Sequence, residues 1–317
     1  MSAEQVHRTT HDVEIAAPAA VVYSLISDAV KWPLFFPPNV HVEQLESDGT
    51  DERLRMWATA NGTVKSWTSR RRLDGAGRRI DFRQEVPAAP LTGMGGSWIV
   101  EERGQSSSRL VLLHDFTVGD RRGDAAWVER ATDTNSRAEL GRVKELAELR
   151  PRLDALVLSF EDSVHIEGPA EPVYDFLHRV GDWPRLLPHV DRLDLTEDMP
   201  GVQVMAMDTR TADGSVHTTE SIRVCFPGAG RIVYKQTATP ALMDAHTGAW
   251  SVVADEAGVR VTSRHDVVLR EEAIGRVLGA DATVEQARRY VREALGRNST
   301  ATLHLAKQHA EAALAPR

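Results

Sequence analysis

The chain has 317 residues, of which 42% are hydrophobic and 26% charged, with a formal net charge of −8. This length exceeds twice that of a common domain, so two domains are expected. No run of about 18 apolar residues is present to cross a bilayer, and the dispersed charge lacks the basic stripe of general nucleic-acid binding, so neither a membrane nor a nucleic acid is an expected partner.

The first half of the chain begins with alternating residues that predict a strand over about 10–16. A helix is expected to follow near Pro18, because proline suits a first helical turn, and a second, short helix to begin at Trp32-Pro33. Alternating segments separated by turn signals such as DGAG then predict antiparallel hairpins. Helical periodicity predicts a long closing helix over about 124–149.

The second half repeats this series, with a strand over about 159–167, a helix near Pro169, a short helix at Trp183-Pro184, hairpins and a long helix over about 282–313. Matched residues are 151 positions apart at first, as in Trp32 and Trp183. The spacing is 152 for three later pairs: Ser69 and Ser221, Arg71 and Arg223, and Trp98 and Trp250. It returns to 151 for His114 and His265. Such a register indicates an internal duplication.

The boundary between the copies is expected near Pro151 to Leu158, which gives an N-terminal domain over 1–152 and a C-terminal domain over 158–317. Each copy combines a strand, two short helices, a six-stranded meander and one long helix. We therefore expect two tandem α+β domains, in each of which a curved antiparallel sheet wraps around the long C-terminal helix and leaves an internal cavity.

Three ordered motifs carry a resemblance to a known family: W-P-x-x-F at Trp32–Phe36, W-x-S-x-R at Trp67–Arg71, and the strand tryptophan Trp98. Within the duplicated pattern they resemble the polyketide aromatase/cyclases of bacterial type II polyketide synthases, which have the helix-grip fold of the Bet v 1-like or START-like superfamily. The tandem arrangement is similar to the di-domain members. The resemblance covers nearly the whole chain.

The resemblance implies an enzyme that folds a linear poly-β-ketone chain, delivered by an acyl carrier protein, and makes its first ring aromatic by aldol cyclisation and dehydration. Di-domain members typically take chains in which one ketone is already reduced. The implied partners are an acyl carrier protein and other type II polyketide synthase components. The reaction needs no cofactor. The twelve histidines have no metal-ligand spacing and no glycine-rich phosphate loop follows a strand, so neither a metal nor a nucleotide is expected.

Alternation places Trp67, Ser69 and Arg71 on one strand face, and the large apolar ring indicates that this face points inward. Arg71 suits a clamp on a carbonyl oxygen that gains negative charge. Ser69 would supply a second donor or relay a proton, while Trp67 and Trp98 would limit the substrate to one curled conformation. The alternative is an architectural Ser-Arg pair that bonds neighbouring backbone and a buried carboxylate.

His114 shares the inward set of its strand with Leu112 and Phe116. An imidazole can take an α-proton and protonate a leaving hydroxyl near neutral pH, so His114 and its repeat partner His265 are candidate acid-base residues for dehydration. The alternative is that each bonds only a neighbouring backbone or carboxylate group.

In the second copy one strand face carries His217, Thr219, Ser221 and Arg223, which predicts a polar pocket wall and a candidate second active site. Two divisions of labour stay open. Either one domain closes the ring and the other dehydrates it, or one domain is mainly structural.

The remaining candidates for substrate contact are Trp32, Phe36, Asn39, Asn135, Trp250 and Asn298. Asn39 stands where single-domain relatives often carry a pocket tyrosine. Asn135 and Asn298 each precede a serine within a long helix, at positions where core is expected, so they would meet internal water or ligand. Packing of the short helix is the alternative for Trp32 and Trp183.

Two further functional readings remain: a non-catalytic carrier of lipids or other hydrophobic ligands, and a scaffold for a synthase assembly. The N-terminus MSAEQVHRTTHDVEI lacks a secretory pattern and Cys225 is the only cysteine, so a cytoplasmic location is expected.

Overall fold

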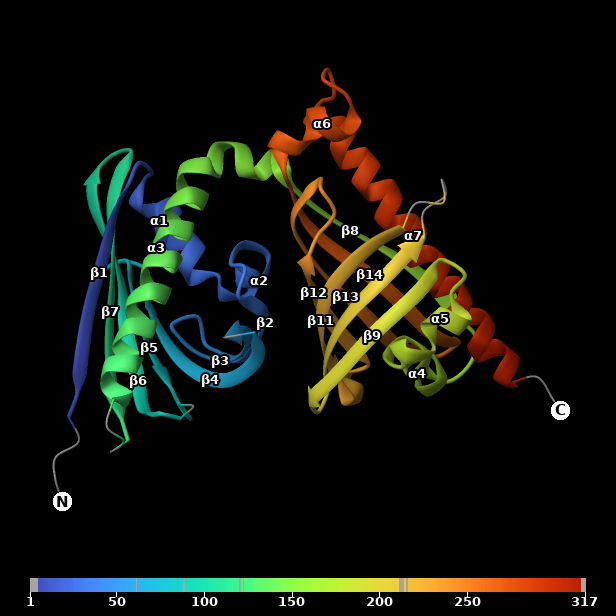
Figure 1. The fold of residues 1–317 in the computed structure, drawn as a ribbon, viewed down its shortest axis with the longest axis horizontal. Helices are drawn as coiled ribbons and strands as arrows, with labels where there is room; N and C mark the ends of the chain where they lie inside the picture. The colour runs from blue at the N-terminus through green and yellow to red at the C-terminus, as the bar shows by residue number, and fades with distance from the viewer. Residues whose placement is uncertain are drawn as a thin grey trace. The chain divides into compact units, whose positions relative to one another are not determined.

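The computed structural model describes residues 5–314 except 61, 88, 120, 122, 211–213 and 215. The chain divides into two compact units, Met1–Leu153 and Asp154–Arg317. Figure 1 shows one sheet and one long helix in each unit. In the part of the chain that is described, no helix has the length and apolar character that spanning a membrane requires.

The first unit has a seven-stranded antiparallel sheet in the order β1-β7-β6-β5-β4-β3-β2. Its elements in chain order are β1 (His7–Ile15), α1 (Ala19–Ser27), the 3-10 turn η1 (Ala29–Lys31), α2 (Trp32–Phe35), β2 (Asn39–Ser47), β3 (Asp51–Ala60), β4 (Thr63–Asp74), β5 (Arg79–Gln84), β6 (Leu91–Gly104), β7 (Ser107–Val118) and α3 (Asp124–Leu156). The strand that precedes the helices thus pairs with the last strand of a six-stranded meander.

The second unit repeats this topology, in the order β8-β14-β13-β12-β11-β10-β9. Its elements are β8 (Val157–Ile166), α4 (Ala170–His178), η2 (Val180–Asp182), α5 (Trp183–Leu186), β9 (Val190–Met199), β10 (Val202–Arg210), β11 (Val216–Phe226), η3 (Pro227–Ala229), β12 (Arg231–Ala238), β13 (Met243–Asp255), β14 (Gly258–Leu269), η4 (Glu271–Ala273), α6 (Ile274–Leu278) and α7 (Val284–Leu314). The turn η4 and helix α6 were not predicted.

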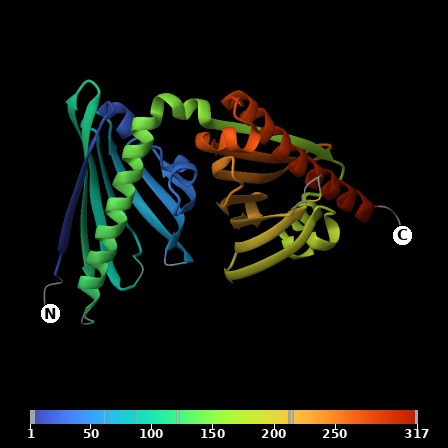
Figure 2. The ribbon, with the colours of Figure 1, turned by 45° about the horizontal axis from the view of Figure 1, so that its top comes forward.

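The long helix of each unit lies across one face of its own sheet (Figure 2). Apolar side chains recur on the buried side of α3 at Val128, Leu140, Val143 and Ala147. That spacing follows the helical period, so a single stripe of α3 faces the interior. The interior is therefore bounded by the sheet, the long helix and the short helices that precede the meander.

The first long helix extends to Leu156, seven residues beyond the expected end at 149, and contains Pro151. Proline removes one helical hydrogen bond and crowds the preceding turn. Leu153 and Leu156 are nevertheless buried beyond it, and their burial offsets that cost. The strand β8 then begins at the next residue.

Candidate functional site

One row of paired residues crosses the inner face of each sheet. In the first unit the register joins Arg71 to Phe82, Phe82 to Gly96, and Gly96 to His114. The matching row of the second unit consists of Arg223, Tyr234, Gly248 and His265. The fold thus brings each predicted arginine and histidine onto one face, separated by an aromatic residue and a glycine.

The expected alternation along β4 is present, since Ser69 and Arg71 are each only 4% exposed while Arg70 and Arg72 are exposed. The Ser69 hydroxyl donates to the backbone oxygen of Arg83, 3.1 Å away. Its counterpart Ser221 is also buried. The inward orientation predicted for this strand is therefore correct.

Arg71 joins the end of α1 to the sheet. Its Nε donates to Glu52 Oε1 at 2.5 Å, and its terminal nitrogens donate to the backbone oxygens of Ile26 at 3.0 Å and Ser27 at 2.5 Å. Carbonyls in the last turn of a helix lack intrahelical partners, so these bonds satisfy groups that need a donor. Burial lowers the pKa of Arg71, and the Glu52 carboxylate opposes this effect.

Arg223 makes the matching connection in the second unit, with bonds to the backbone oxygen of Leu177 at 2.6 Å and to Gln203 Oε1 at 3.0 Å. Gln203 follows Glu52 by 151 positions, so the carboxylate partner of the first unit is a neutral amide in the second. The architectural alternative for the repeated arginine thus has direct geometric support in both units.

The two W-P tryptophans occupy equivalent positions. Trp32 Nε1 donates to the backbone oxygen of Leu25, and Trp183 Nε1 to that of Phe176, both at 3.1 Å. The guanidinium carbon of Arg71 lies 5.2 Å from the Trp32 ring centroid, as that of Arg223 lies 5.5 Å from Trp183. These tryptophans therefore tie the short helices to the arginine anchor.

A buried polar cluster surrounds His265 in the second unit. Tyr234 Oη lies 3.1 Å and His246 Nε2 3.0 Å from His265 Nδ1, while Ser263 Oγ lies 3.2 Å from His265 Nε2. His246 Nδ1 is 2.9 Å from Gln236 Oε1. The sequence prediction missed Tyr234, His246 and Ser263. One signal was available, because Tyr234 takes the place of Phe82 in the repeat.

The charge state of this cluster follows from burial. Burial lowers the pKa of His265 to about 4, and burial with the neighbouring His265 lowers that of His246 to about 3. Burial raises the pKa of Tyr234. At neutral pH the cluster therefore presents two neutral imidazoles with lone pairs and a phenol that keeps its proton.

His114 has a sparser environment. Its Nδ1 lies 3.4 Å from Ser136 Oγ, and its ring meets Phe82 edge-on with centroids 5.6 Å apart. Burial, followed by the charge of His11, lowers the pKa of His114 to about 4. The expectation of a histidine that exchanges protons near neutral pH therefore needs correction: both His114 and His265 are neutral at pH 7.

The glycine in each row permits a close approach. A Cβ at Gly248 would collide with the Tyr234 ring and with the backbone oxygen of Arg264, and one at Gly96 would collide with Phe82 and the backbone oxygen of Leu113. The absence of a side chain lets the aromatic ring lie against the neighbouring strand. These glycines thus hold the aromatic residue next to the histidine.

Three predicted substrate-contact residues lie elsewhere than expected. Asn135 and Asn298 are exposed, whereas the following serines, Ser136 and Ser299, are 1% and 4% exposed. One residue along a helix turns the side chain by about 100°, so a one-residue error in phase exchanges the inner and outer faces. His217 is also exposed, which removes it from the predicted pocket wall, while Thr219 is partly buried.

The other residues predicted to contact substrate pack against neighbouring side chains or begin a strand. Trp98 and Trp250 are buried on the inner face of the sheets, and Phe36 is buried with its ring edge-on to Trp32. Trp67 is partly buried and packs against a core group of Ala29, Val42, Leu54 and Met56. Asn39 begins β2, and its backbone N–H donates to Phe36 O at 3.1 Å.

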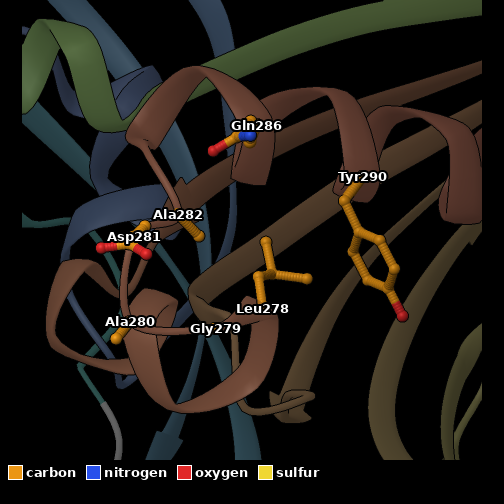
Figure 3. Close-up of a pocket in the computed structure, with 7 residues that line it drawn as sticks. All are labelled: Leu278, Gly279, Ala280, Asp281, Ala282, Gln286 and Tyr290. Carbon is orange, nitrogen blue, oxygen red and sulfur yellow. The ribbon is translucent and has the colours of Figure 1, made fainter.

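One pocket lies away from these rows, and a second includes residues of the first row. The first, of about 400 Å³, is formed by residues 278–282 with Gln286 and Tyr290, which project from α7 (Figure 3). The second, of about 310 Å³, is lined by Arg71, Phe82 and Gly96 of the first row together with the exposed Arg70 and Arg72. No predicted catalytic residue lines the first pocket. The interior cavity between sheet and helix stays a prediction.

Known proteins share both the sequence and the duplication. The family described as polyketide cyclase/dehydrase and lipid transport matches residues 6–148 and again 157–301. The bifunctional cyclase/dehydratase of the granaticin polyketide synthase of Streptomyces violaceoruber is 42% identical over 310 residues, 97% of this chain and 95% of that protein. Its counterpart of the actinorhodin polyketide synthase of Streptomyces coelicolor is 42% identical over 327 residues, 100% of this chain and 99% of that protein.

Solved structures agree over both units. The di-domain aromatase/cyclase BexL from the BE-7585A biosynthetic pathway superposes with a TM-score of 0.89 and 51% identity, covering 96% of this chain and 99% of BexL. StfQ from the steffimycin biosynthetic pathway gives a TM-score of 0.86 and 35% identity, with 96% and 99% covered. The chain therefore belongs to the polyketide cyclase/dehydrase family, with the tandem START-like domains of the di-domain aromatase/cyclases, and is an enzyme of this class.

Proposed function

We propose that the protein closes the first ring of a carrier-protein-bound poly-β-ketone by an aldol reaction and then dehydrates that ring to an aromatic one. A ketoreduced chain is the proposed substrate. The observation that carries the proposal is the position of His114 and His265, which lie on the inner faces of two repeated sheets with buried hydroxyl groups within 3.4 Å. A carrier of apolar ligands has no need of such groups.

The proposed chemistry uses neutral donors and acceptors. Methylenes between two ketones are acidic, so a neutral imidazole lone pair suffices as a base when the substrate is held close to it. In the second unit the Tyr234 phenol, whose pKa is raised by burial, supplies a donor to a departing hydroxyl. Dehydration is therefore assigned to the cluster around His265, and ring closure to the first unit.

Arg71 and Arg223 take a modified role in this proposal. Their hydrogen bonds to helix-end carbonyls fix each guanidinium at one end of the histidine row. A fixed positive charge in a water-poor interior stabilises an oxyanion more strongly than the same charge in water. We propose that both arginines are positioning residues and that their charge also contributes to the electrostatic stabilisation of an oxyanion in the interior.

The proposed partners are an acyl carrier protein and other type II polyketide synthase components, in the cytoplasm. The names of the relatives as synthase components support this assignment. An acidic carrier protein would need free basic residues, but Arg70, Arg78 and Arg79 each form an ion pair, with Glu85, Glu102 and Asp81 respectively. Paired charges attract an acidic partner weakly.

The decisive experiment adds the protein to a minimal polyketide synthase with a ketoreductase and follows the products. With wild type present, a first-ring aromatic compound should replace the shunt products that form without it. His265→Gln should accumulate a cyclised but undehydrated product, and circular dichroism should show that the variant is folded. If wild type leaves the products unchanged while it binds an apolar ligand, the carrier function is correct and this proposal is wrong.

A further inference from the structure

A second buried histidine lies beside His114 in the first unit. His11, on β1, is 8% exposed, and its Nε2 lies 2.8 Å from Asp133 Oδ1 of α3. Arg137 holds the same carboxylate, with Nη2 3.1 Å from Oδ1. The carboxylate thus fixes the orientation of the imidazole through one ring nitrogen.

The other ring nitrogen has no such partner. Among the described residues, His11 Nδ1 is buried without a hydrogen bond, and so is Thr9 Oγ1, two positions earlier on the same strand face. Thr9 pairs with His114 in the sheet, and His11 pairs with the next inward residue, Leu112. Buried polar atoms without partners are rare in proteins. Two of them beside a predicted catalytic histidine indicate a place for polar atoms of a ligand.

In the second unit, different residues form the contact between the first strand and the long helix. Asp162 stands where the repeat places His11, and it binds Arg292 Nη2 of α7 at 2.6 Å. The extra imidazole of that unit is instead His246, where the first unit has Met94. Each unit therefore places a second imidazole near its repeated histidine, but from a different strand.

We propose that His11 is a catalytic residue of the first unit, namely the base that starts ring closure, and that Asp133 is its positioning residue. This inference rests on the proposed function. With Nε2–H donated to Asp133, the Nδ1 lone pair is directed to the ligand. The Thr9 hydroxyl donates to a carbonyl oxygen of the substrate.

The proposed step balances without a further reagent. His11 Nδ1 takes a proton from a methylene between two ketones, and the C–H electron pair forms an enolate. The enolate carbon makes the new C–C bond to a ketone carbon, whose π electrons become an alkoxide. The imidazolium returns the proton to that alkoxide, which gives the ring alcohol that dehydration later removes.

The test compares three variants of the full chain in the reconstituted synthase. His11→Gln keeps a donor toward Asp133 but lacks a basic nitrogen, so ring closure should fall about a hundredfold while the thermal midpoint stays near that of wild type. His11→Ala should regain ring closure when imidazole is added, which a structural role would not produce. His7→Gln, on the same strand face and stacked on Phe116, should keep wild-type activity.

The outcomes separate this inference from the proposed function. An active wild type together with a fully active His11→Gln overturns the role of His11 and leaves the proposed function in place. An inactive wild type overturns both. Asp133→Asn should lower ring closure and shift its pH profile; an unchanged pH profile overturns the positioning role of Asp133.

Discussion

His246 Nε2 lies 3.0 Å from His265 Nδ1, and the two rings stack with centroids 5.3 Å apart. Two neutral imidazoles share a buried contact that the Tyr234 hydroxyl also reaches. The first unit has no such pair at the same position, because Met94 stands where the second has His246. The duplicated sheets therefore carry different acid-base groups on one scaffold.

Replacement of the Tyr234 hydroxyl should separate its chemical role from its packing. Tyr234→Phe gives the second unit the residue of the first, Phe82, and keeps the ring beside Gly248. We expect dehydration to slow by at least about tenfold, while stability changes by about 1 kcal/mol. Single-turnover product analysis with urea denaturation checks both. A variant with full dehydration activity would show that the phenol is not the donor.

Stability should fall as the pH drops from about 6.5 to about 4. His265 has a folded pKa of about 4, below the ordinary histidine value of about 6.5. Between these values the unfolded chain binds the proton and the folded chain does not, so acidification favours unfolding. Between these two pKa values, His265 alone lowers the free energy of unfolding by up to about 1.4 kcal/mol for each pH unit of acidification.

The control for this pH dependence is His265→Gln, which removes one titrating group. Urea midpoints measured at several pH values should show a shallower loss of stability in the variant than in wild type. Parallel curves for the two proteins would contradict the assigned shift in pKa.

The arginine anchor should be needed for folding as well as for activity. Arg71→Ala removes the charged partner of the buried Glu52 carboxylate, which keeps the Gln44 amide as a donor, and it removes the donor to two helix-end carbonyls. We therefore expect a loss of about 3–5 kcal/mol in the free energy of unfolding. Glu52→Gln reproduces the Arg223–Gln203 pair of the second unit and should cost less. Equilibrium urea unfolding measures both. Equal losses for the two variants would refute the anchor role.

Alanine at two glycines should have opposite effects. Gly248→Ala places a methyl group against Tyr234 and should destabilise the second unit by at least about 1–3 kcal/mol. Gly141, inside α3, has open space around its Cα, so Gly141→Ala should stabilise the chain by about 0.5–1 kcal/mol. Thermal unfolding compares them, and a neutral Gly248→Ala would mean that the Tyr234 ring is free to move.

The sequence by itself determined the duplication, the order of strands and helices, and the inward face of β4. These follow from local rules, because alternation fixes which side of a strand is apolar and a repeat makes each copy a check on the other. The W-P motifs also located the short helices α2 and α5 correctly.

Only the tertiary structure decided which side chains meet. His11 reaches Asp133 across 122 positions of sequence, and Tyr234 reaches His265 across 31. Such contacts depend on strand register and on the phase of the long helix, where a one-residue error exchanged Asn135 for Ser136. The same long-range geometry gave Arg71 its helix-end partners, which no local pattern of the strand contains.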